Sequence, residues 1–359
     1  MKNFIEILNE LPKSELHVHL RGAMPVSVFR ELLDEHSSEG IKNLIPPQYF
    51  SMLEKYPNIC PFLTALSWNE KDVQNLFSYS NFDQFLATFF FTSFFIRNAQ
   101  DFRKLVYAVL EKLKSQNIVY AEITFSALEY MKSGVSLAEI KDCLEETRNF
   151  PGMEVRWIVD LVRNNGVEVV MDLLKQIIAI DCKNIVGITL GGSEHHFPPK
   201  PFEKVYAVAK DHGFNLTVHA GESLGPQSVW DALLVLKATR IGHGVQSIHD
   251  PKLLEYLANH KIALEICPAS NFRTSVIPKD QEHPVKKIFE AGVPVTLSTD
   301  DPTFFGTSLV EEYAYAASLG LSNKSILEIL QNGFQYAFLA EEKKKKYIQE
   351  LTAKWQSLL

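Results

Sequence analysis

The sequence predicts an α/β protein with a (β/α)8 TIM barrel, and three observations lead to this fold class. Eight short segments rich in Val, Ile, Leu and Thr have the length and composition of buried strands. Segments with apolar residues at helical spacing separate most of them. From the third strand onward the strands recur about every 30 residues, which is the length that a parallel strand with its crossover helix needs.

The predicted elements follow one another in the order that a barrel requires. The strands cover residues 15–20, 119–125, 154–161, 185–190, 215–219, 240–243, 263–267 and 294–299. The crossover helices cover residues 167–180, 201–212, 228–238, 251–260 and 285–291. Residues 308–359 are predicted to form helices that pack outside the barrel, with the charged run at 341–346 exposed to solvent.

The connection after the first strand is too long for a single crossover. We therefore expect residues from about 22 to 117 to form an inserted helical cap over the barrel mouth, within one domain that spans residues 1–359. Its phenylalanine-rich part, residues 78–96, is predicted to be helical. Most of these phenylalanines are expected to pack in the core, and a few are expected to line a pocket.

The composition excludes several classes of protein. A net charge of −7 disfavours a protein that binds nucleic acid, because such proteins gather positive charge on one face. The four cysteines are too far apart for a disulfide framework or a cysteine zinc site. The N-terminal segment lacks the pattern of a signal peptide, and the most apolar stretch is shorter than the roughly 18 residues of a membrane span. We therefore expect a cytoplasmic protein without a membrane association.

Polar side chains gather at the carboxyl ends of the predicted strands, where TIM barrels carry their chemistry. They are His17 and His19 on strand one, His219 and Glu222 at strand five, His243 at strand six, and Asp300 and Asp301 at strand eight. The two histidines of strand one face the same way because side chains alternate along a strand. Imidazoles in an apolar interior need partners or a metal, and the two adjacent aspartates would repel each other without a nearby cation. The sequence therefore predicts a divalent metal site.

Imidazoles together with one carboxylate favour zinc, although iron or manganese fits the same ligands, and we expect one Zn²⁺ per chain. His17, His19, His219 and Asp300 are the predicted ligands, and they leave one position open for water. A metal so held lowers the pKa of its water to about 7. Glu222 is then placed to carry a proton. His243 is expected to orient the water or to help deprotonate it.

Five motifs occur in order along the chain: HVHLRG, HAGE, RIGHG, CPASN and LSTDDP. Together they resemble the adenosine deaminase family of metal-dependent amidohydrolases over nearly the whole chain. The resemblance implies the zinc ligands already predicted, with Glu222 protonating the purine ring nitrogen beside the carbon under attack. It also implies that Asp301 holds the opposite ring nitrogen and that the backbone amide of Gly192 contacts the purine. The implied reaction replaces the amino group of an adenine ring by oxygen and releases ammonia.

Two positions depart from the family pattern and bear on the substrate. Adenosine-specific members usually carry an Asp that contacts the sugar hydroxyl where this chain has Arg21, and they read Ala-Gly-Asp-Glu where it has Gly191-Gly192-Ser193-Glu194. A guanidinium suits a carboxylate or phosphate, which it can grip with two hydrogen bonds. The family includes enzymes for 6-amino-6-deoxyfutalosine, an adenine nucleoside with a carboxyphenyl group on a menaquinone route. Arg21 and a phenylalanine-rich cap favour that small-molecule substrate. The alternative is that Arg21 is a loop residue in a surface salt bridge.

Other interpretations stay open at this point. They are an adenosine deaminase of purine salvage, a two-metal amidohydrolase on the same barrel, and a non-catalytic purine-binding protein. The two-metal enzyme needs a bridging group near strand four, which Leu190 to Ser193 does not supply. His195 and His196 lie in a loop. They either line the entrance to the substrate site or have no catalytic role. We expect His283 to be structural and Cys267 to pack in the barrel, while Ser270 and Asn271 are placed to help the site.

Overall fold

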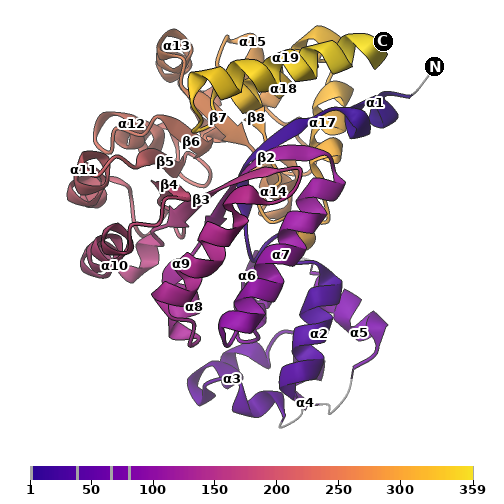
Figure 1. The fold of residues 1–359 in the computed structure, drawn as a ribbon, viewed down its shortest axis with the longest axis vertical. Helices are drawn as coiled ribbons and strands as arrows, with labels where there is room; N and C mark the ends of the chain where they lie inside the picture. The colour runs from indigo at the N-terminus through magenta and orange to yellow at the C-terminus, as the bar shows by residue number, and fades with distance from the viewer. Residues whose placement is uncertain (1–2, 38–39, 65–67, 80–81, 359) are drawn as a thin grey trace.

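The computed structural model describes residues 3–37, 40–64, 68–79 and 82–358. Eight parallel strands follow one another around a sheet in chain order, so each strand pairs with its neighbour in sequence (Figure 1). They are β1 (Lys13–His19), β2 (Ile118–Phe125), β3 (Glu154–Asp160), β4 (Ile185–Thr189), β5 (Asn215–Ala220), β6 (Arg240–His243), β7 (Ala263–Ile266) and β8 (Val295–Leu297). All eight predicted strands are present, which confirms the (β/α)8 fold class.

The barrel closes at a single bridge between Val18 and Asp300, just beyond the end of β8. The amide of His19 donates to the carbonyl of Asp300 at 2.8 Å, and the amide of Asp300 donates to the carbonyl of His17 at 2.9 Å. Three of the predicted metal ligands therefore lie at the seam where the first and last strands meet.

Helices cover the outside of the sheet and connect consecutive strands. After β2 the structure has α8 (Ala127–Lys132), α9 (Leu137–Glu146), α10 (Val167–Ile180), α11 (Glu203–Asp211), α12 (Pro226–Leu234), α13 (Pro251–His260), α14 (Pro268–Arg273), α15 (Val285–Glu290) and α16 (Pro302–Phe305). Helices α10 and α13 match their predicted bounds. Helix α12 ends four residues earlier than predicted, because the chain leaves the helix before Lys237, which has a left-handed φ of 59°.

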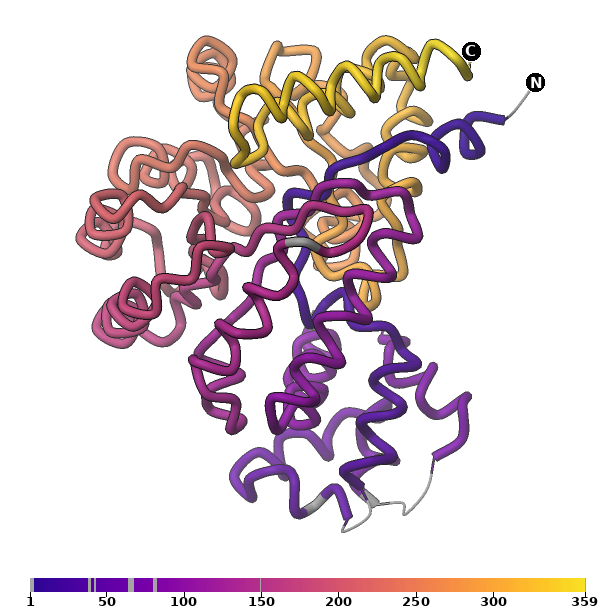
Figure 2. Tube along the Cα trace, in the orientation of Figure 1, coloured from indigo at the N-terminus to yellow at the C-terminus, as the bar shows by residue number. Residues whose placement is uncertain are grey.

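The segment predicted as a cap consists of helices. They are α2 (Val26–His36), α3 (Pro47–Leu53), α4 (Cys60–Thr64), α5 (Glu70–Leu76), α6 (Phe82–Ser93) and α7 (Ala99–Ser115), with a short 3-10 turn at Ile41–Asn43. In Figures 1 and 2 helices α2 to α5 lie at the lower end of the view, below the strands. Phe91 of α6 and Phe95, which follows this helix, are fully buried, as expected for core packing. Phe85 and Phe89 line a cavity, as expected for a few members of this segment.

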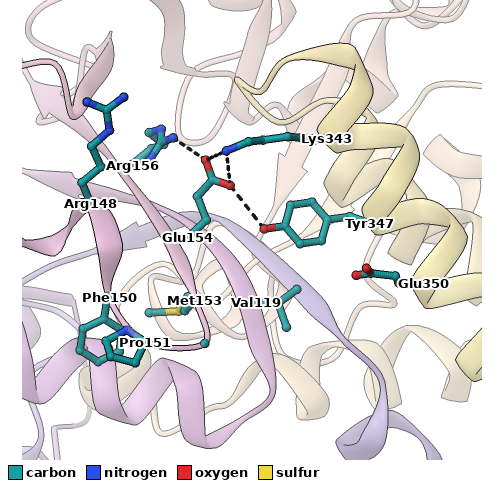
Figure 3. Close-up of a pocket in the computed structure, with 11 residues that line it drawn as sticks. Val119, Arg148, Phe150, Pro151, Met153, Glu154, Arg156, Lys343, Tyr347 and Glu350 are labelled. Atoms are coloured by element: carbon teal, nitrogen blue, oxygen red, sulfur yellow. Dashed lines mark hydrogen bonds and ion pairs between the residues drawn. The ribbon is translucent and has the colours of Figure 1, made fainter.

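The C-terminal helices α17 (Leu309–Ser318), α18 (Asn323–Gln335) and α19 (Glu341–Leu358) lie outside the barrel, as predicted. Figure 3 shows how α19 is fastened to the amino-terminal end of β3: Lys343 contacts both carboxylate oxygens of Glu154, at 2.7 and 2.8 Å. Arg156 and Tyr347 bind the same carboxylate. This network surrounds a cavity of about 750 Å³ that contains none of the predicted site residues. None of the helices in the described ranges is long and apolar enough to cross a membrane.

Candidate active site

A second cavity, of about 760 Å³, lies at the carboxyl ends of the strands. It brings together most of the predicted site residues, namely His19, Gly192, His195, His196, His219, Glu222, His243, Asp300 and Asp301. Phe85, Leu86 and Phe89 of α6 and Phe305 of α16 form an apolar wall. His17 lies beneath this cavity and is only 2% exposed. Residues that are up to 284 positions apart in sequence therefore meet at one end of the barrel.

Four of these side chains form a compact, buried set of potential metal ligands. Ligand atoms of His17, His219, His243 and Asp300 all lie within 4.8 Å of one another. His19 joins them from the cavity side: its Nε2 atom is 3.2 Å from Nε2 of His219 and 3.2 Å from Oδ1 of Asp300. The predicted ligands His17, His19, His219 and Asp300 are thus adjacent, and His243 stands beside them.

His17 is oriented toward this cluster by Glu265, which sequence reasoning missed. Oε2 of Glu265 lies 2.8 Å from Nδ1 of His17. Glu265 is ionised: burial opposes this, but the Arg240 guanidinium and His17 hold its pKa at about 2. The ionised carboxylate accepts the Nδ1 proton, so Nε2 is the ring atom that faces the cluster. That buried Nε2 has no hydrogen-bond partner among the described residues, as expected of an atom that is built to bind a metal.

His219 and Asp300 are also held by second groups. Oγ1 of Thr189 is 3.0 Å from Nδ1 of His219, which leaves Nε2 facing the cluster. The hydroxyl of Ser270 donates to Oδ2 of Asp300 at 2.6 Å, so Ser270 lies beside the site, and its contribution to the chemistry stays a prediction. Burial opposes ionisation of Asp300, but the facing imidazoles of His17 and His19 hold its pKa well below the usual range.

The proton on His243 can be traced through a chain of hydrogen bonds. The amide of Val285 donates to Nδ1 of His283, so His283 carries its proton on Nε2 and donates to Oδ1 of Asn271. Nδ2 of Asn271 then faces Nδ1 of His243 at 3.3 Å and donates to it. His243 is therefore protonated on Nε2, and burial lowers its pKa to about 3, so it is neutral. In this tautomer His243 offers the site a hydrogen-bond donor.

Glu222 follows β5 and reaches into the cavity near His243. Its Oε2 atom is 3.8 Å from Nε2 of His243. Burial raises the pKa of Glu222 to about 8, and the Asp300 carboxylate adds to this shift. A carboxyl group with this pKa holds a proton at neutral pH and can donate it to a substrate.

Asp301 lies in the cavity wall. The eighth strand is shorter than its predicted range of 294–299, because β8 ends at Leu297. Asp300, between this strand and Asp301, has a left-handed φ of 61°. Oδ1 of Asp301 is buried without a hydrogen-bond partner among the described residues. Burial and the Asp300 carboxylate raise the pKa of Asp301 to about 7.

Arg21 has a protein partner in the structure. Its Nη1 atom is 3.0 Å from Oε2 of Glu129 on α8, and its guanidinium lies 3.8 Å from the centre of the Phe89 ring. Arg21 is 5% exposed, and Glu129 and Phe89, rather than Arg21, line the cavity. A direct contact between Arg21 and an acidic substrate group stays a prediction; Nε of Arg21 has no hydrogen-bond partner among the described residues.

The remaining predicted residues lie as follows. The backbone of Gly192 lines the cavity with a φ of 90°, and an added Cβ would lie 2.3 Å from Oδ1 of Asn164. His195 and His196 are exposed at the cavity, where Nδ1 of His196 contacts the Ser193 hydroxyl at 2.8 Å. Cys267 is fully buried, as predicted for barrel packing.

The chain is similar to known proteins over almost its whole length. A model of the family described as adenosine deaminase matches residues 12–354. An aminodeoxyfutalosine deaminase from Streptomyces coelicolor is 33% identical over 357 residues, covering 96% of this chain and 85% of that protein. An adenosine deaminase from Vibrio cholerae is 32% identical over 351 residues, covering 94% and 97%. The fold matches that of an adenine deaminase from Arthrobacter aurescens, with a TM-score of 0.82, 23% identity, and coverage of 97% and 99%.

Proposed function

This chain belongs to the adenosine deaminase family and is a metal-dependent deaminase of an adenine-type substrate, and on that premise we propose that it deaminates 6-amino-6-deoxyfutalosine. The proposal places the enzyme in the cytoplasm, on a route to menaquinone. The observation that carries it is the phenylalanine wall of the cavity. Phe85 and Phe89 from the cap and Phe305 from α16 line the cavity together with the polar residues, and an aromatic 5′ group can stack on them.

The donor set fits one zinc ion per chain. Three imidazoles and one carboxylate are the ligands that zinc prefers, and the unpartnered Nε2 of His17 faces the other donors. In this proposal His17, His19, His219 and Asp300 hold the ion. A bound metal would supply a water whose pKa is lowered to about 7.

The other residues recognise the purine and move protons. Protonated Glu222 donates its proton to the ring nitrogen beside the amino-bearing carbon, which makes that carbon more electrophilic. His243 donates its Nε2 proton in a hydrogen bond to the oxygen that adds to this carbon. Asp301 and the amide of Gly192 bind the opposite ring nitrogen and the ring edge.

Adenosine is the second candidate substrate, and Glu129 is the observation that favours it. This carboxylate lies in the cavity wall with 40% of its side chain exposed, and it can accept hydrogen bonds only. A sugar hydroxyl is a donor that would satisfy it. An acidic 5′ group would instead meet Glu129 as a like charge, unless Arg21 pairs with the incoming acid.

The decisive experiment compares kcat/KM for the two nucleosides on the zinc-loaded enzyme. We expect 6-amino-6-deoxyfutalosine to be the better substrate. A hundredfold higher kcat/KM for adenosine would refute the proposal that 6-amino-6-deoxyfutalosine is the substrate. The variant Arg21→Gln should lower kcat/KM for the acidic nucleoside more than for adenosine. An equal loss on both would remove Arg21 from substrate recognition.

A further inference from the structure

The carboxylate of Glu194 accepts several hydrogen bonds from the loop that contains Glu222. Oε1 of Glu194 accepts a hydrogen bond from the amide of Gly221 at 2.6 Å and another from the hydroxyl of Ser228. Oε2 accepts from the amides of Ser223 and Leu224, both at 2.9 Å, and from the Ser223 hydroxyl at 3.3 Å. Glu194 is 4% exposed and lies in the connection after β4, so it bridges two neighbouring strand ends.

Glu222 itself lacks such restraints. Its carboxyl group forms no hydrogen bond within the described part of the chain, and its Oε2 atom lies 3.8 Å from Nε2 of His243. The position of its side chain therefore depends on the backbone that flanks it. Gly221 turns this backbone with a left-handed φ of 64°, and an added Cβ there would lie 2.4 Å from Val229. The Glu194 carboxylate therefore stabilises this backbone conformation by hydrogen bonds on both sides of Glu222.

We propose that Glu194 is a positioning residue for proton transfer, acting through the loop to hold Glu222 at the purine. This inference rests on the proposed function, in which Glu222 supplies the proton. Both oxygens of Glu194 are occupied by loop donors, so it does not itself exchange a proton with the substrate.

The chemistry of the carboxylate explains why a neutral amide would not replace it. The variant Glu194→Gln keeps the volume of the side chain but turns one acceptor into an NH2 group that faces N–H donors. Loop amides that were paired then lose their partner, which favours a displaced loop. A displacement of about 1 Å between a proton donor and its target can cost about 100-fold in rate. We expect kcat to fall by about 10- to 100-fold, with a much smaller change in KM.

The test is a double-mutant cycle on the full-length, zinc-loaded enzyme. Deamination rates are measured for the wild type, Glu194→Gln, Glu222→Gln and the double variant, with adenosine and 6-amino-6-deoxyfutalosine as probes. Glu203→Gln, an exposed carboxylate at the start of α11, serves as the matched control and should retain the wild-type kcat. Bound metal and Tm are measured for each variant, and hydrogen exchange is followed at residues 221–224.

If Glu194 acts through Glu222, its substitution lowers kcat in the wild-type background and has no further effect in the Glu222→Gln background. The amides of residues 221–224 should exchange faster in Glu194→Gln while bound metal is retained. The inference is overturned by a wild-type kcat in Glu194→Gln, by an equal loss in both backgrounds, or by loss of the metal. A wild type that deaminates neither nucleoside would refute the proposed function instead.

Discussion

Replacing Gly22 by alanine tests whether Asp301 recognises the purine. Gly22 lies in the turn after β1 and packs directly against Asp301. An alanine Cβ at this position would lie 1.8 Å from Oδ1, 2.5 Å from Cγ and 2.7 Å from Cα of Asp301. To reach ordinary contact at 3.4 Å, Oδ1 must retreat by about 1.6 Å. Because the backbone Cα is also too close, rotation of the side chain alone cannot relieve the overlap.

The size of this displacement sets the expected loss. Misplacing a recognition group by about 1 Å can cost about 100-fold in rate, so we expect kcat/KM for deamination to fall by 100-fold or more. Overpacking of a tight site costs about 1–3 kcal/mol of folding free energy. The variant should therefore fold and keep its metal, since the contact is with Asp301 and none of the predicted ligands.

The assay measures kcat/KM, Tm and bound zinc for Gly22→Ala beside a matched control. Gly225→Ala is that control, because a Cβ there has no heavy atom within 4 Å and its φ of −68° suits alanine. A Gly22→Ala enzyme with kcat/KM within threefold of the wild type would refute the role of Asp301. Loss of zinc from this variant would show that the overlap displaces Asp300 as well.

Three further predictions concern the metal and the fold. Glu265→Gln should weaken zinc binding by about 10- to 100-fold and destabilise the fold, whereas exposed Glu255→Gln should do neither; titration with zinc and Tm check this. Removal of zinc by a chelator should abolish deamination and lower Tm, and added zinc should restore both. Burial lowers the pKa of His283 to about 3, so between about pH 3 and 6.5 only the unfolded chain binds this proton and stability rises with pH. In the His283→Asn variant the free energy of unfolding, measured from denaturation curves at several pH values, should rise less steeply with pH over this range. An unchanged pH dependence would contradict this prediction.

The barrel and most of the site could be predicted because they leave local marks in the sequence. Buried parallel strands are continuous apolar runs, and their carboxyl ends carry the only chemistry that such a fold exposes. His17 and His19 share a face because strand side chains alternate. The expectation that site residues lie at the carboxyl ends of strands, applied at four strand ends, was sufficient to predict a cluster of residues that are far apart in sequence.

The groups that orient the cluster were not predicted, because their partners lie on other strands and are set by how the strands are arranged in the barrel. Glu265 meets His17 across 248 positions and Thr189 meets His219 across 30. A usable signal was present: Glu265 is a lone charge within an apolar strand, and such a residue needs a buried partner. Arg21 shows the opposite case, since nothing in its neighbourhood in sequence indicates Glu129 or the Phe89 ring.

The seam of the barrel explains why metal chemistry and folding are joined in this chain. Asp300 closes the sheet through its backbone, to the carbonyl of His17 and the amide of His19, and presents its carboxylate to both imidazoles. Its left-handed φ turns the next residue, Asp301, into the cavity wall. One backbone conformation therefore places the proposed metal ligand Asp300 and the proposed purine-binding group Asp301 side by side. We expect a change that alters the turn at Asp300 to disturb closure, metal binding and substrate recognition together, whereas a change at Gly22 acts directly on Asp301.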